Sequence, residues 1–410
     1  MHRMYTLDDL AAKNKKVLVR VDLNMPMQDG LILDDDRMNR IVPTLLELCR
    51  QQAKVIICSH LGRPKGKDLS LSMQGIAEHL SQKTGVPVVF IADLDNAGKI
   101  IEDLPAGHIA FLENLRFHPG EESNDTTFAQ HLATLADVYV NEAFSVSHRA
   151  HASVEAVAHL LPSYAGRQMQ AEIKALSLAF DHPQEPIIAI VGGSKVSTKL
   201  SILKSLAQKV MYLVPAGGLA NTFALAHDIS VGRSICEPDM LDMVMEIEEV
   251  ALNSGCAILS PSDVVVTDAL SPDGKHRICL PSEVHYKEMI VDFGPQTVHD
   301  IFKISQLCRT LIWNGPLGVF EVPPFEQGSV ELARKIANLT ERHGLFSVAG
   351  GGETNAVIHQ ANVHDKFSYM STAGGAFLEW IEGKKLPGVE ALKRESVNVK
   401  KKDGKVSYGI

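Results

Sequence analysis

The stretch PIIAIVGGSKVSTK, residues 186–199, is an apolar run that ends in two glycines and two lysines. A continuous run this rich in isoleucine and valine predicts a strand that is covered on both faces. Strands of this kind form parallel sheets, in which ligands bind beyond the carboxyl ends of the strands. A helix that began here would direct Lys195 and Lys199, four residues apart, toward one anion. The stretch therefore predicts an α/β fold with an anion site at a strand end.

The same pattern recurs along the whole chain. Short β-rich runs alternate with longer segments of helical spacing, such as 39–51 and 197–209. This alternation predicts parallel sheets with helices on both faces. We expect buried strands at 16–23, 53–60, 86–93, 108–114 and 137–143, and again at 186–193, 209–218, 256–269, 310–318 and 345–352.

A helical segment near 166–181, followed by DHPQEP, marks the predicted domain boundary. It divides the chain into two α/β domains of similar size, 1–170 and 171–379. The sequence contains no internal repeat of fixed period. The basic, weakly apolar end of the chain, from residue 393, is predicted to be a solvated extension.

Composition excludes several classes of protein. The chain has 410 residues, of which 45% are hydrophobic and 22% charged, which is typical of a soluble protein of two or three domains. A net charge of -9 argues against general nucleic-acid binding. No apolar stretch approaches the roughly 18 residues of a membrane span, and the N-terminus does not look like a signal peptide. Six cysteines without a CxxC motif indicate reduced thiols. We expect a cytoplasmic protein without nucleic-acid or membrane partners.

Arginines and histidines follow the strands of the first half. The loops RVDLNMP (20–26), SHLGRPKG (59–66), ENLRFHPGEE (113–122) and FSVSHRAHAS (144–153) supply His60, Arg63, Arg116, His148, Arg149 and His151, and Arg37 follows the first loop. Guanidinium groups that converge in one place match phosphate or carboxylate. Asp22 and Asn24 could fix a hydroxyl of the same ligand. His148 and His151 have no further His or Cys at the spacing of a metal site, so they do not predict one. The first half therefore predicts a site for a small, anionic, hydroxylated molecule.

Glycine turns follow the strands of the second half. They read PAGGLANTF (215–223), WNGPLGVFE (313–321), GGGET (350–354) and STAGGAF (371–377). Together they predict a flat, backbone-lined groove for a nucleotide, with Glu321 on the ribose. The chain has no Walker A loop of the form G-x-x-x-x-G-K-[ST] and no dinucleotide-binding motif G-x-G-x-x-G. It also lacks the G-x-S-x-G motif of serine hydrolases. An acid beside phosphates repels them unless Mg²⁺ lies between, so Glu353 is a candidate metal ligand.

Taken in order, the motifs resemble those of phosphoglycerate kinase. The stretches RVDLNMP, SHLGRPKG, LENLRFHPGEE, HRAHAS, WNGPLGVFE, GGGET and EGKKLPGVEAL cover about residues 5 to 392. The resemblance implies two Rossmann-like, three-layer domains with parallel sheets, separated by a cleft and joined by a hinge helix. Residues 1–170 would bind 3-phosphoglycerate or 1,3-bisphosphoglycerate, with the segment from about 380 to 410 packed back on them. Residues 171–379 would bind Mg-ADP or Mg-ATP, and the protein would be a monomer.

The resemblance also assigns residues. It places Asp22, Asn24, Arg37, His60, Leu61, Gly62, Arg63, Arg116 and Arg149 on the three-carbon acid. It places Gly193, Ser194, Lys199, Gly217, Gly218, Gly294, Asn314, Glu321, Gly351, Gly352, Glu353 and Thr354 on the nucleotide, with Glu353 on Mg²⁺. The catalytic residues that it implies are Arg37, Lys195, Lys199, Gly374 and Gly375. Of these, Arg37 and Lys199 are expected to make contacts that strengthen during phosphoryl transfer.

Several positions depart from the family pattern. Glu353 replaces an aspartate, and its extra methylene moves the carboxylate by roughly 1.5 Å. GGSKVSTK replaces GGAKVSDK, and AFSVSHRAH replaces AFGTAHRAH. Ala216 and Ala373 replace glycines, which matters only where φ is positive or a base touches the Cα.

Three other functions stay open from the sequence. The first is a binding protein on the same fold that lacks catalysis. The second is a different acyl-phosphate kinase or nucleotide-dependent transferase. A nicotinamide-dependent dehydrogenase is the third, and it has the least support.

Overall fold

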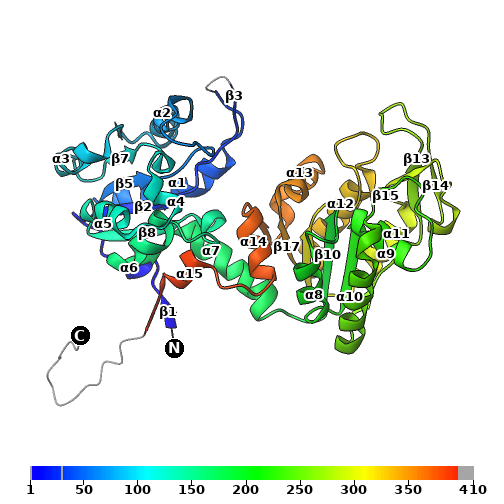
Figure 1. Cartoon of the computed structure of the whole chain (residues 1–410). Coiled ribbons are helices and arrows are strands. Elements are labelled where there is room, and N and C mark those ends of the chain that lie inside the picture. The colour runs from blue at the N-terminus through cyan, green and yellow to red at the C-terminus, as the bar shows by residue number, and fades with distance from the viewer. Residues whose placement is uncertain (1, 29–30, 396–410) are drawn as a thin grey trace, which may run out of the picture. The chain divides into compact units, whose positions relative to one another are not determined.

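The chain divides into two compact units in the computed structural model, which describes residues 2–28 and 31–395. Unit 1 consists of Met1–Ala171 and Lys385–Ile410, and unit 2 of Glu172–Lys384. Helix α7 (Arg167–Leu176) contains the first boundary (Figure 1). The chain thus passes from unit 1 into unit 2 and returns to unit 1 near its end.

Unit 1 is built on a six-stranded parallel sheet. Its strands, in spatial order, are β6 (Val88–Ile91), β7 (Ile109–Leu112), β5 (Lys54–Cys58), β2 (Lys16–Val21), β8 (Val138–Glu142) and β9 (Ser163–Ala165). The helices of this unit include α1 (Asp36–Arg50), α2 (Gln74–Thr84), α3 (Ala97–Glu102), α4 (Pro119–Glu122), α5 (Thr126–Thr134) and α6 (Val157–Leu160). The central strands β2, β5 and β8 are almost entirely buried, as expected of a sheet with both faces covered.

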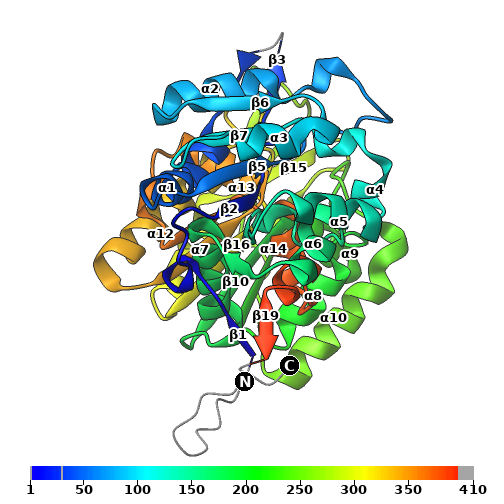
Figure 2. The same cartoon turned by 90° about the vertical axis from the view of Figure 1, so that its left-hand side faces the viewer.

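The end of the described chain is part of unit 1. Strand β19 (Lys393–Glu395) pairs antiparallel with β1 (His2–Met4), as Figure 2 shows. Just before it, α15 (Pro387–Glu390) lies against the loop that follows β8, where Gly388 N donates a hydrogen bond of 2.9 Å to Ser147 O. Leu386, Val389 and Leu392 are buried. We call residues 385–395 the return segment. A small hairpin of β3 (Met27–Gln28) and β4 (Leu31–Ile32) completes the strands of this unit, and residues 396–410 lie outside the described part.

Unit 2 has a second six-stranded parallel sheet. Its order is β12 (Ala257–Ile258), β11 (Tyr212–Gly217), β10 (Ile187–Gly193), β16 (Thr310–Asn314), β17 (Phe346–Gly350) and β18 (Tyr369–Ser371). The helices are α8 (Leu200–Ala207), α9 (Gly218–Ala226), α10 (Leu241–Ser254), α11 (Pro295–Ser305), α12 (Gln327–His343), α13 (Gly352–Gln360) and α14 (Gly374–Ile381). Helix α10 packs against α8 and α9, whereas α12 packs against α11 and α13. Trp313, fully buried, lies in the core of this unit.

Each sheet has one point where the strand order reverses. In unit 1 the chain moves outward from β2 through β5 and later starts again at β8 on the other side. In unit 2 it moves outward from β10 through β11 and starts again at β16. Loops at such a point diverge to opposite faces of the sheet and leave a crevice between them. The fold therefore provides one ligand crevice at β2/β8 and another at β10/β16.

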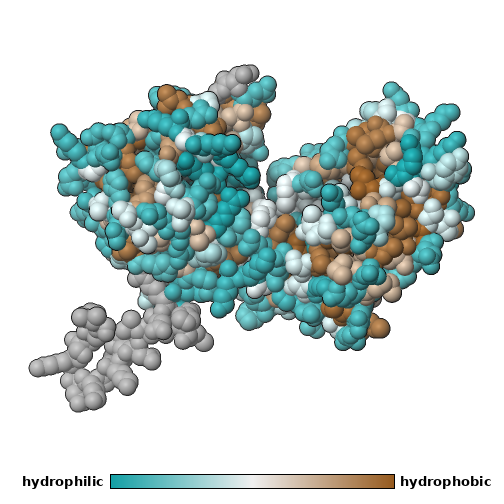
Figure 3. Space-filling model, viewed as in Figure 1, coloured by the Kyte–Doolittle hydropathy of each residue, from teal (hydrophilic) through white to brown (hydrophobic). Residues whose placement is uncertain are grey.

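The single strand predicted at 256–269 is wrong. Strand β12 ends at Ile258, and Pro261 follows, which lacks the N–H that a continuing ladder needs. The apolar residues beyond it form β13 (Val264–Thr267), in a separate antiparallel sheet with β14 (His276–Cys279) and β15 (Met289–Phe293). Figure 3 shows apolar surface on the part of unit 2 that contains this small sheet. Ile278 in β14 and Leu280 just after it are about half-exposed.

Within the described ranges, no helix combines the length and apolarity needed to cross a bilayer.

Candidate functional site

The crevice of unit 1 is organised around Asp22, which follows β2. Its Oδ2 accepts hydrogen bonds from the Arg37 guanidinium and from Ser145 Oγ, and its Oδ1 accepts from Asn24 N at 3.1 Å. Asn24 Oδ1 in turn accepts from Gly62 N at 2.9 Å. Burial opposes ionisation of Asp22, but the charge of Arg37 holds the pKa of this carboxyl below its usual value. Asp22 and Asn24 together thereby join the loops after β2, β5 and β8.

Arg116 closes the same network from the loop after β7. Its Nη1 donates to Gly62 O, its Nε lies 3.1 Å from Glu122 Oε1, and burial lowers its pKa. Arg149 is half-buried, with its Nε 3.2 Å from His148 Nε2. Arg63 is exposed, and its guanidinium makes no ion pair with the described residues. Arginines in three different settings thus belong to the loops around one crevice.

A buried arginine contacts the residues of this crevice, and its role was not predicted from the sequence. Arg20 lies in β2 and is 1% exposed. Its Nη2 lies 3.1 Å from His60 Nδ1, and its Nε donates to Ser153 Oγ at 2.8 Å. Ser153 Oγ donates at 2.6 Å to Glu121, whose side chain is fully buried. The only signal in the sequence is an arginine inside the apolar run KVLVRV, and its partners are distant in the sequence.

His60 is neutral at physiological pH. Burial and the neighbouring charge of Arg20 lower its pKa to about 2. The same causes lower the pKa of His151 to about 4. Leu61, the next residue, is buried, and its carbonyl accepts from Asn114 Nδ2 at 2.8 Å. The crevice therefore combines permanent guanidinium charges with one carboxylate and neutral imidazoles, a set that fits an anion carrying a hydroxyl group.

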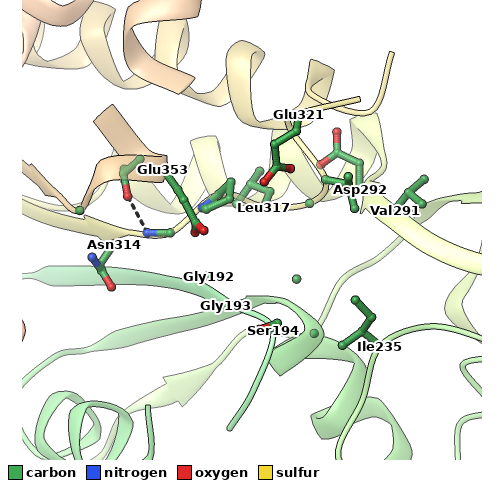
Figure 4. A pocket seen from close by; sticks show the side chains of 18 of the residues that line it. Gly192, Gly193, Ser194, Ile235, Val291, Asp292, Asn314, Leu317, Glu321 and Glu353 are labelled. Carbon is green, nitrogen blue, oxygen red and sulfur yellow. Dashed lines mark hydrogen bonds between the residues drawn. The ribbon is translucent and has the colours of Figure 1, made fainter. Parts of the chain in front are cut away.

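The crevice of unit 2 is a pocket of about 890 Å³ at the ends of β10, β11, β16 and β17 (Figure 4). Of the residues assigned from the sequence, it is lined by Gly193, Ser194, Lys199, Gly217, Gly218, Asn314, Glu321, Gly351, Gly352, Glu353, Thr354 and Gly374. Lys195, Gly294 and Gly375 are not part of this lining. Gly294 is instead the N-cap of α11, where an added Cβ would lie 2.2 Å from Asp263 Cγ.

Lys199 is fixed at the floor of the pocket. Its Nζ donates to Asn314 Oδ1, and Asn314 Nδ2 donates at 2.6 Å to Gly350 O. Gly315 N donates at 2.6 Å to Thr354 Oγ1, so the turns after β16 and β17 are bound together. Burial lowers the pKa of Lys199, while the carboxylate of Glu353 opposes this change. An ammonium group with so few polar partners in the protein is available to an anionic ligand.

The two lysines of 195–199 do not share a helix face, contrary to the prediction. Helix α8 begins at Leu200, with Lys199 as its N-cap, and Lys195 is exposed in the preceding turn. Thr198 Oγ1 donates at 2.9 Å to Lys195 O, and Ser197 Oγ donates at 2.6 Å to Glu237. Side-chain bonds of this kind compete with the first turn of a helix.

Three of the four glycine turns begin helices, namely α9, α13 and α14. Helices α13 and α14 start at Gly352 and Gly374, so their free amides border the pocket. Gly217 has φ +63°, and an added Cβ would lie 3.1 Å from Gly193 O. Ala216, by contrast, is a strand residue of β11, and Ala373 has φ -89°. Neither alanine occupies a position that requires glycine.

The pocket also has an apolar wall, which sequence reasoning missed. Ile235, which is 63% exposed, lines the pocket, and Leu270 and Leu317 line it too. In Figure 4, Ile235 lies across the opening from Glu321. An isoleucine in the loop SICEP carries no signal by itself, because only the folded chain brings it to the glycine turns.

Of the acids that line this pocket, Glu353 is the one at the start of α13, where we expect the phosphates. Glu353 stands exposed in the first turn of α13 and points into the pocket (Figure 4). The described residues contain no group of three or more His, Cys, Asp or Glu side chains able to hold a metal. A single carboxylate nevertheless fits Mg²⁺, which binds through one or two carboxylates together with ligand phosphates and water.

Comparison with known proteins gives a consistent result. Residues 7–384 match the model of the family described as phosphoglycerate kinase. Proteins named phosphoglycerate kinase from Azorhizobium caulinodans and Novosphingobium aromaticivorans are 48% and 49% identical over 391 and 390 residues. These alignments cover 95% and 94% of the chain and 99% and 98% of the relatives.

Solved structures are similar as well. The phosphoglycerate kinase structure from Coxiella burnetii superposes with a TM-score of 0.87 at 39% identity, covering 95% of this chain and 99% of the other. The one from Pyrococcus horikoshii OT3 has a TM-score of 0.81 at 32% identity, with 95% and 98% covered.

Proposed function

This chain belongs to the phosphoglycerate kinase family, and from that premise we propose that unit 1 holds the three-carbon acid and unit 2 the nucleotide. The protein is a glycolytic kinase that transfers a phosphoryl group between ATP and the carboxyl group of 3-phosphoglycerate. One observation carries the assignment of the two sites. Their chemistry differs, since the first is lined by guanidinium groups and a carboxylate, and the second by glycine turns, a lysine and an apolar wall.

In unit 1 the proposed contacts follow from charge. Arg37, Arg63, Arg116 and Arg149 neutralise the phosphate and carboxylate of 3-phosphoglycerate. Asp22 accepts from the substrate hydroxyl, because its carboxylate has lone pairs beyond those used by its present donors. His60, held neutral, adds a hydrogen bond without adding charge.

In unit 2 the proposed nucleotide spans the pocket. The base packs on the apolar wall at Ile235 and Leu317, and Glu321 accepts from the ribose hydroxyls. Lys199 and the amides at the starts of α13 and α14, including Gly374 and Gly375, meet the phosphates.

We propose that Glu353 holds Mg²⁺ together with the nucleotide phosphates. When bound there, the ion neutralises charge on the phosphate oxygens. The side chain is exposed to the pocket and near enough to Lys199 to affect its pKa, so it adjoins the expected phosphate position.

The proposed chemistry is direct, in-line transfer without a covalent enzyme intermediate. An acyl phosphate already carries a good leaving group, so the protein needs only to position it and to neutralise charge. Arg37 stabilises the carboxylate side of the transferring group and Lys199 the nucleotide side. Direct transfer also requires the two ligands to meet, so the proposal includes a closing movement at α7, which excludes water.

The test is phosphoryl transfer from ATP to 3-phosphoglycerate by the full chain, with Mg²⁺ or Mn²⁺ titrated. We expect turnover with 3-phosphoglycerate and none with acetate or carbamate. Lys199→Ala should lower kcat about 10²- to 10³-fold, as expected for the loss of one preorganised charge contact. Lys204→Ala is the matched control, since that lysine lies on α8 and pairs with Glu246 at 2.6 Å.

Binding of 3-phosphoglycerate without turnover with either metal would contradict the proposed mechanism and favour a binding protein. The proposal also includes action as a monomer in the cytoplasm. Light scattering of the purified chain checks the oligomeric state.

A further inference from the structure

The turn between β10 and α8 carries the lysine of the nucleotide pocket but has few internal contacts. Ser194, Lys195, Ser197 and Thr198 are all exposed. Besides the bond from Lys199 to Asn314, contacts to the turn come from Glu237, which is 40 residues beyond Ser197 along the chain. Ser197 N donates to its Oε2 at 2.9 Å, and Ser197 Oγ donates to its Oε1 at 2.6 Å.

Glu237 belongs to the segment that also carries the apolar wall. Asn221 Nδ2, on α9, donates to Ile235 O at 3.0 Å. Thr222 Oγ1 accepts from Glu237 N at 3.1 Å and donates to Gly218 O at 2.9 Å. The segment is therefore attached to the first turns of α9, whose N-terminal glycine lines the pocket.

These contacts connect three segments on one side of the pocket, in what we call the ring. The turn after β10 contacts the Glu237 carboxylate, Glu237 is part of the segment that carries Ile235, and that segment is bonded to α9. The ring closes at Gly218, where an added Cβ would lie 2.4 Å from Ser194 O. Among the described residues, the hydrogen bonds between the wall segment and the turn are made through the Glu237 carboxylate.

We propose that Glu237 is a positioning residue that fixes the cationic turn at Lys199 relative to the apolar wall at Ile235, so that one nucleotide can contact both. It does not line the pocket and acts through Ser197. The inference rests on the proposed function, because it takes the pocket to hold a nucleotide.

A carboxylate suits this role better than any other side chain. It only accepts hydrogen bonds, and here it receives them from Ser197 N, from Ser197 Oγ and from Val196 N. Burial opposes its ionisation, but these donors and the charge of Lys195 hold the pKa of Glu237 below its usual value. A glutamine would offer one acceptor oxygen and present an N–H to the remaining donors.

The experiment compares the affinities of the full chain for adenosine and for ADP. Adenosine reaches only the wall, whereas ADP spans the wall and the turn. For Glu237→Gln we expect ADP to bind about tenfold more weakly, the effect of losing a hydrogen bond to a charged group. Adenosine should bind within twofold of the parent. Ser197→Ala should weaken ADP in the same direction but less, because Ser197 N remains a donor.

Glu246→Gln is the matched control, because it makes the same chemical change in an ion pair on α10 outside the pocket. It should leave both affinities unchanged. Simple electrostatics predicts the opposite sign from positioning, since the removal of a negative charge near Lys195 would tighten ADP binding. The direction of the change therefore separates the two effects.

Three results would overturn the inference. The first is that Glu237→Gln binds ADP as tightly as the parent or more tightly, and the second is that it weakens adenosine and ADP equally. If Glu237→Gln does not fold, the third is that Ser197→Ala binds ADP with full affinity. A different result, in which the parent chain binds no ADP, would overturn the proposed function and this inference with it.

Discussion

Ser145 shows how one residue alters the environment of Asp22, which we propose to bind the substrate. The sequence reads AFSVSHRAH where the family pattern has a glycine at this position. The structure gives the added hydroxyl a partner, because Ser145 Oγ donates to Asp22 Oδ2, the oxygen that also accepts from Arg37. The departure therefore occupies acceptor capacity on the carboxylate that we expect to bind the substrate hydroxyl.

Replacing Ser145 by alanine should lower the KM for 3-phosphoglycerate by about threefold, a modest fraction of a charged hydrogen bond. The reason is that Asp22 stays oriented by Arg37 and by Asn24 N, while one acceptor site becomes free for the substrate. Steady-state kinetics with each substrate varied separately measure this effect. The KM for ATP serves as the internal control and should not change. A rise in the KM for 3-phosphoglycerate would mean that Ser145 itself orients Asp22 or holds the substrate.

At the scale of elements, Asp292 joins the small antiparallel sheet to helix α12. It lies at the end of β15, is 2% exposed, and accepts from Gly328 N at 2.6 Å in the first turn of the helix. Gly318 and Gly328 make room for it, since a Cβ on either would lie within 3 Å of its carboxylate oxygens. Burial raises the pKa of Asp292 to about 8, and the charge of Glu326 adds to the effect. A protonated acid therefore holds the start of α12 near neutral pH.

This raised pKa makes stability depend on pH in a defined direction. Between pH 3.8 and about 8 the folded state keeps a proton on Asp292 that the unfolded state loses. Stability is therefore fully present below the unfolded pKa and is lost as the pH rises toward 8. The contribution is about 1.4 kcal/mol for each pH unit in this window.

Asp292→Asn should remove this part of the slope, even though the substitution itself destabilises the protein. Urea unfolding of both proteins at pH 6, 7 and 8, followed by a signal from Trp313, provides the comparison. Parallel lines for the parent and the variant would show that Asp292 is ionised in the folded state. The converging lines that we expect would show that it is protonated.

The same elements show what the sequence could and could not predict. Strands such as β2 and β10 are confirmed, because an apolar run buried on both faces looks alike in any parallel sheet. The glycine turns after the strands were recognisable too, and two of them lie at the starts of α13 and α14. The strand predicted at 256–269 is interrupted by Pro261, in spite of its apolar pattern. The helix predicted to begin at 195–199 begins later, because the side chains of Ser197 and Thr198 make local hydrogen bonds.

The candidate sites divide in a similar way. Arginines in strand-end loops were recognisable, because cations beyond a parallel strand have few structural uses. Arg20 and Ile235 were not recognisable from the sequence. The role of Arg20 depends on Glu121, and that of Ile235 depends on the glycine turns, and these partners are far away in the sequence. Contacts of this kind are set by tertiary packing and leave no local pattern. The assigned roles of the individual residues stay predictions until they are tested by substitution.

At the scale of the whole molecule, the return segment connects the last described residues to the loop after β8, which we propose to bind the three-carbon acid. Gly388 N donates to Ser147 O, and Ser147 precedes the His148–Arg149 pair by one residue. An added Cβ on Gly388 would lie 2.6 Å from Val154 Cγ1 and 2.8 Å from Ser147 Oγ. The last described elements of the chain therefore support the substrate site that we propose within its first 151 residues.

Gly388→Ala should destabilise unit 1 by about 1–3 kcal/mol, as overpacking does, and should raise the KM for 3-phosphoglycerate more than that for ATP. Gly75→Ala in α2 is the matched control in the same unit, since its Cβ would have no atom within 4 Å. It should raise stability by about 0.5–1 kcal/mol, because alanine is the better helix former. Chemical denaturation and steady-state kinetics of both variants measure these effects. Equal changes in both KM values would contradict a local effect on the acid-binding loop.

The return segment also has a consequence during protein synthesis. Domains of a growing chain generally fold in the order in which they leave the ribosome, the N-terminal one first. Here strand β1 receives its partner β19 only after all of residues 172–384 have been translated. Unit 2 is continuous and has its complete sheet as soon as β18 has emerged, whereas unit 1 still waits for its final strand and helix. The domain that the ribosome begins first is therefore the one that it finishes last.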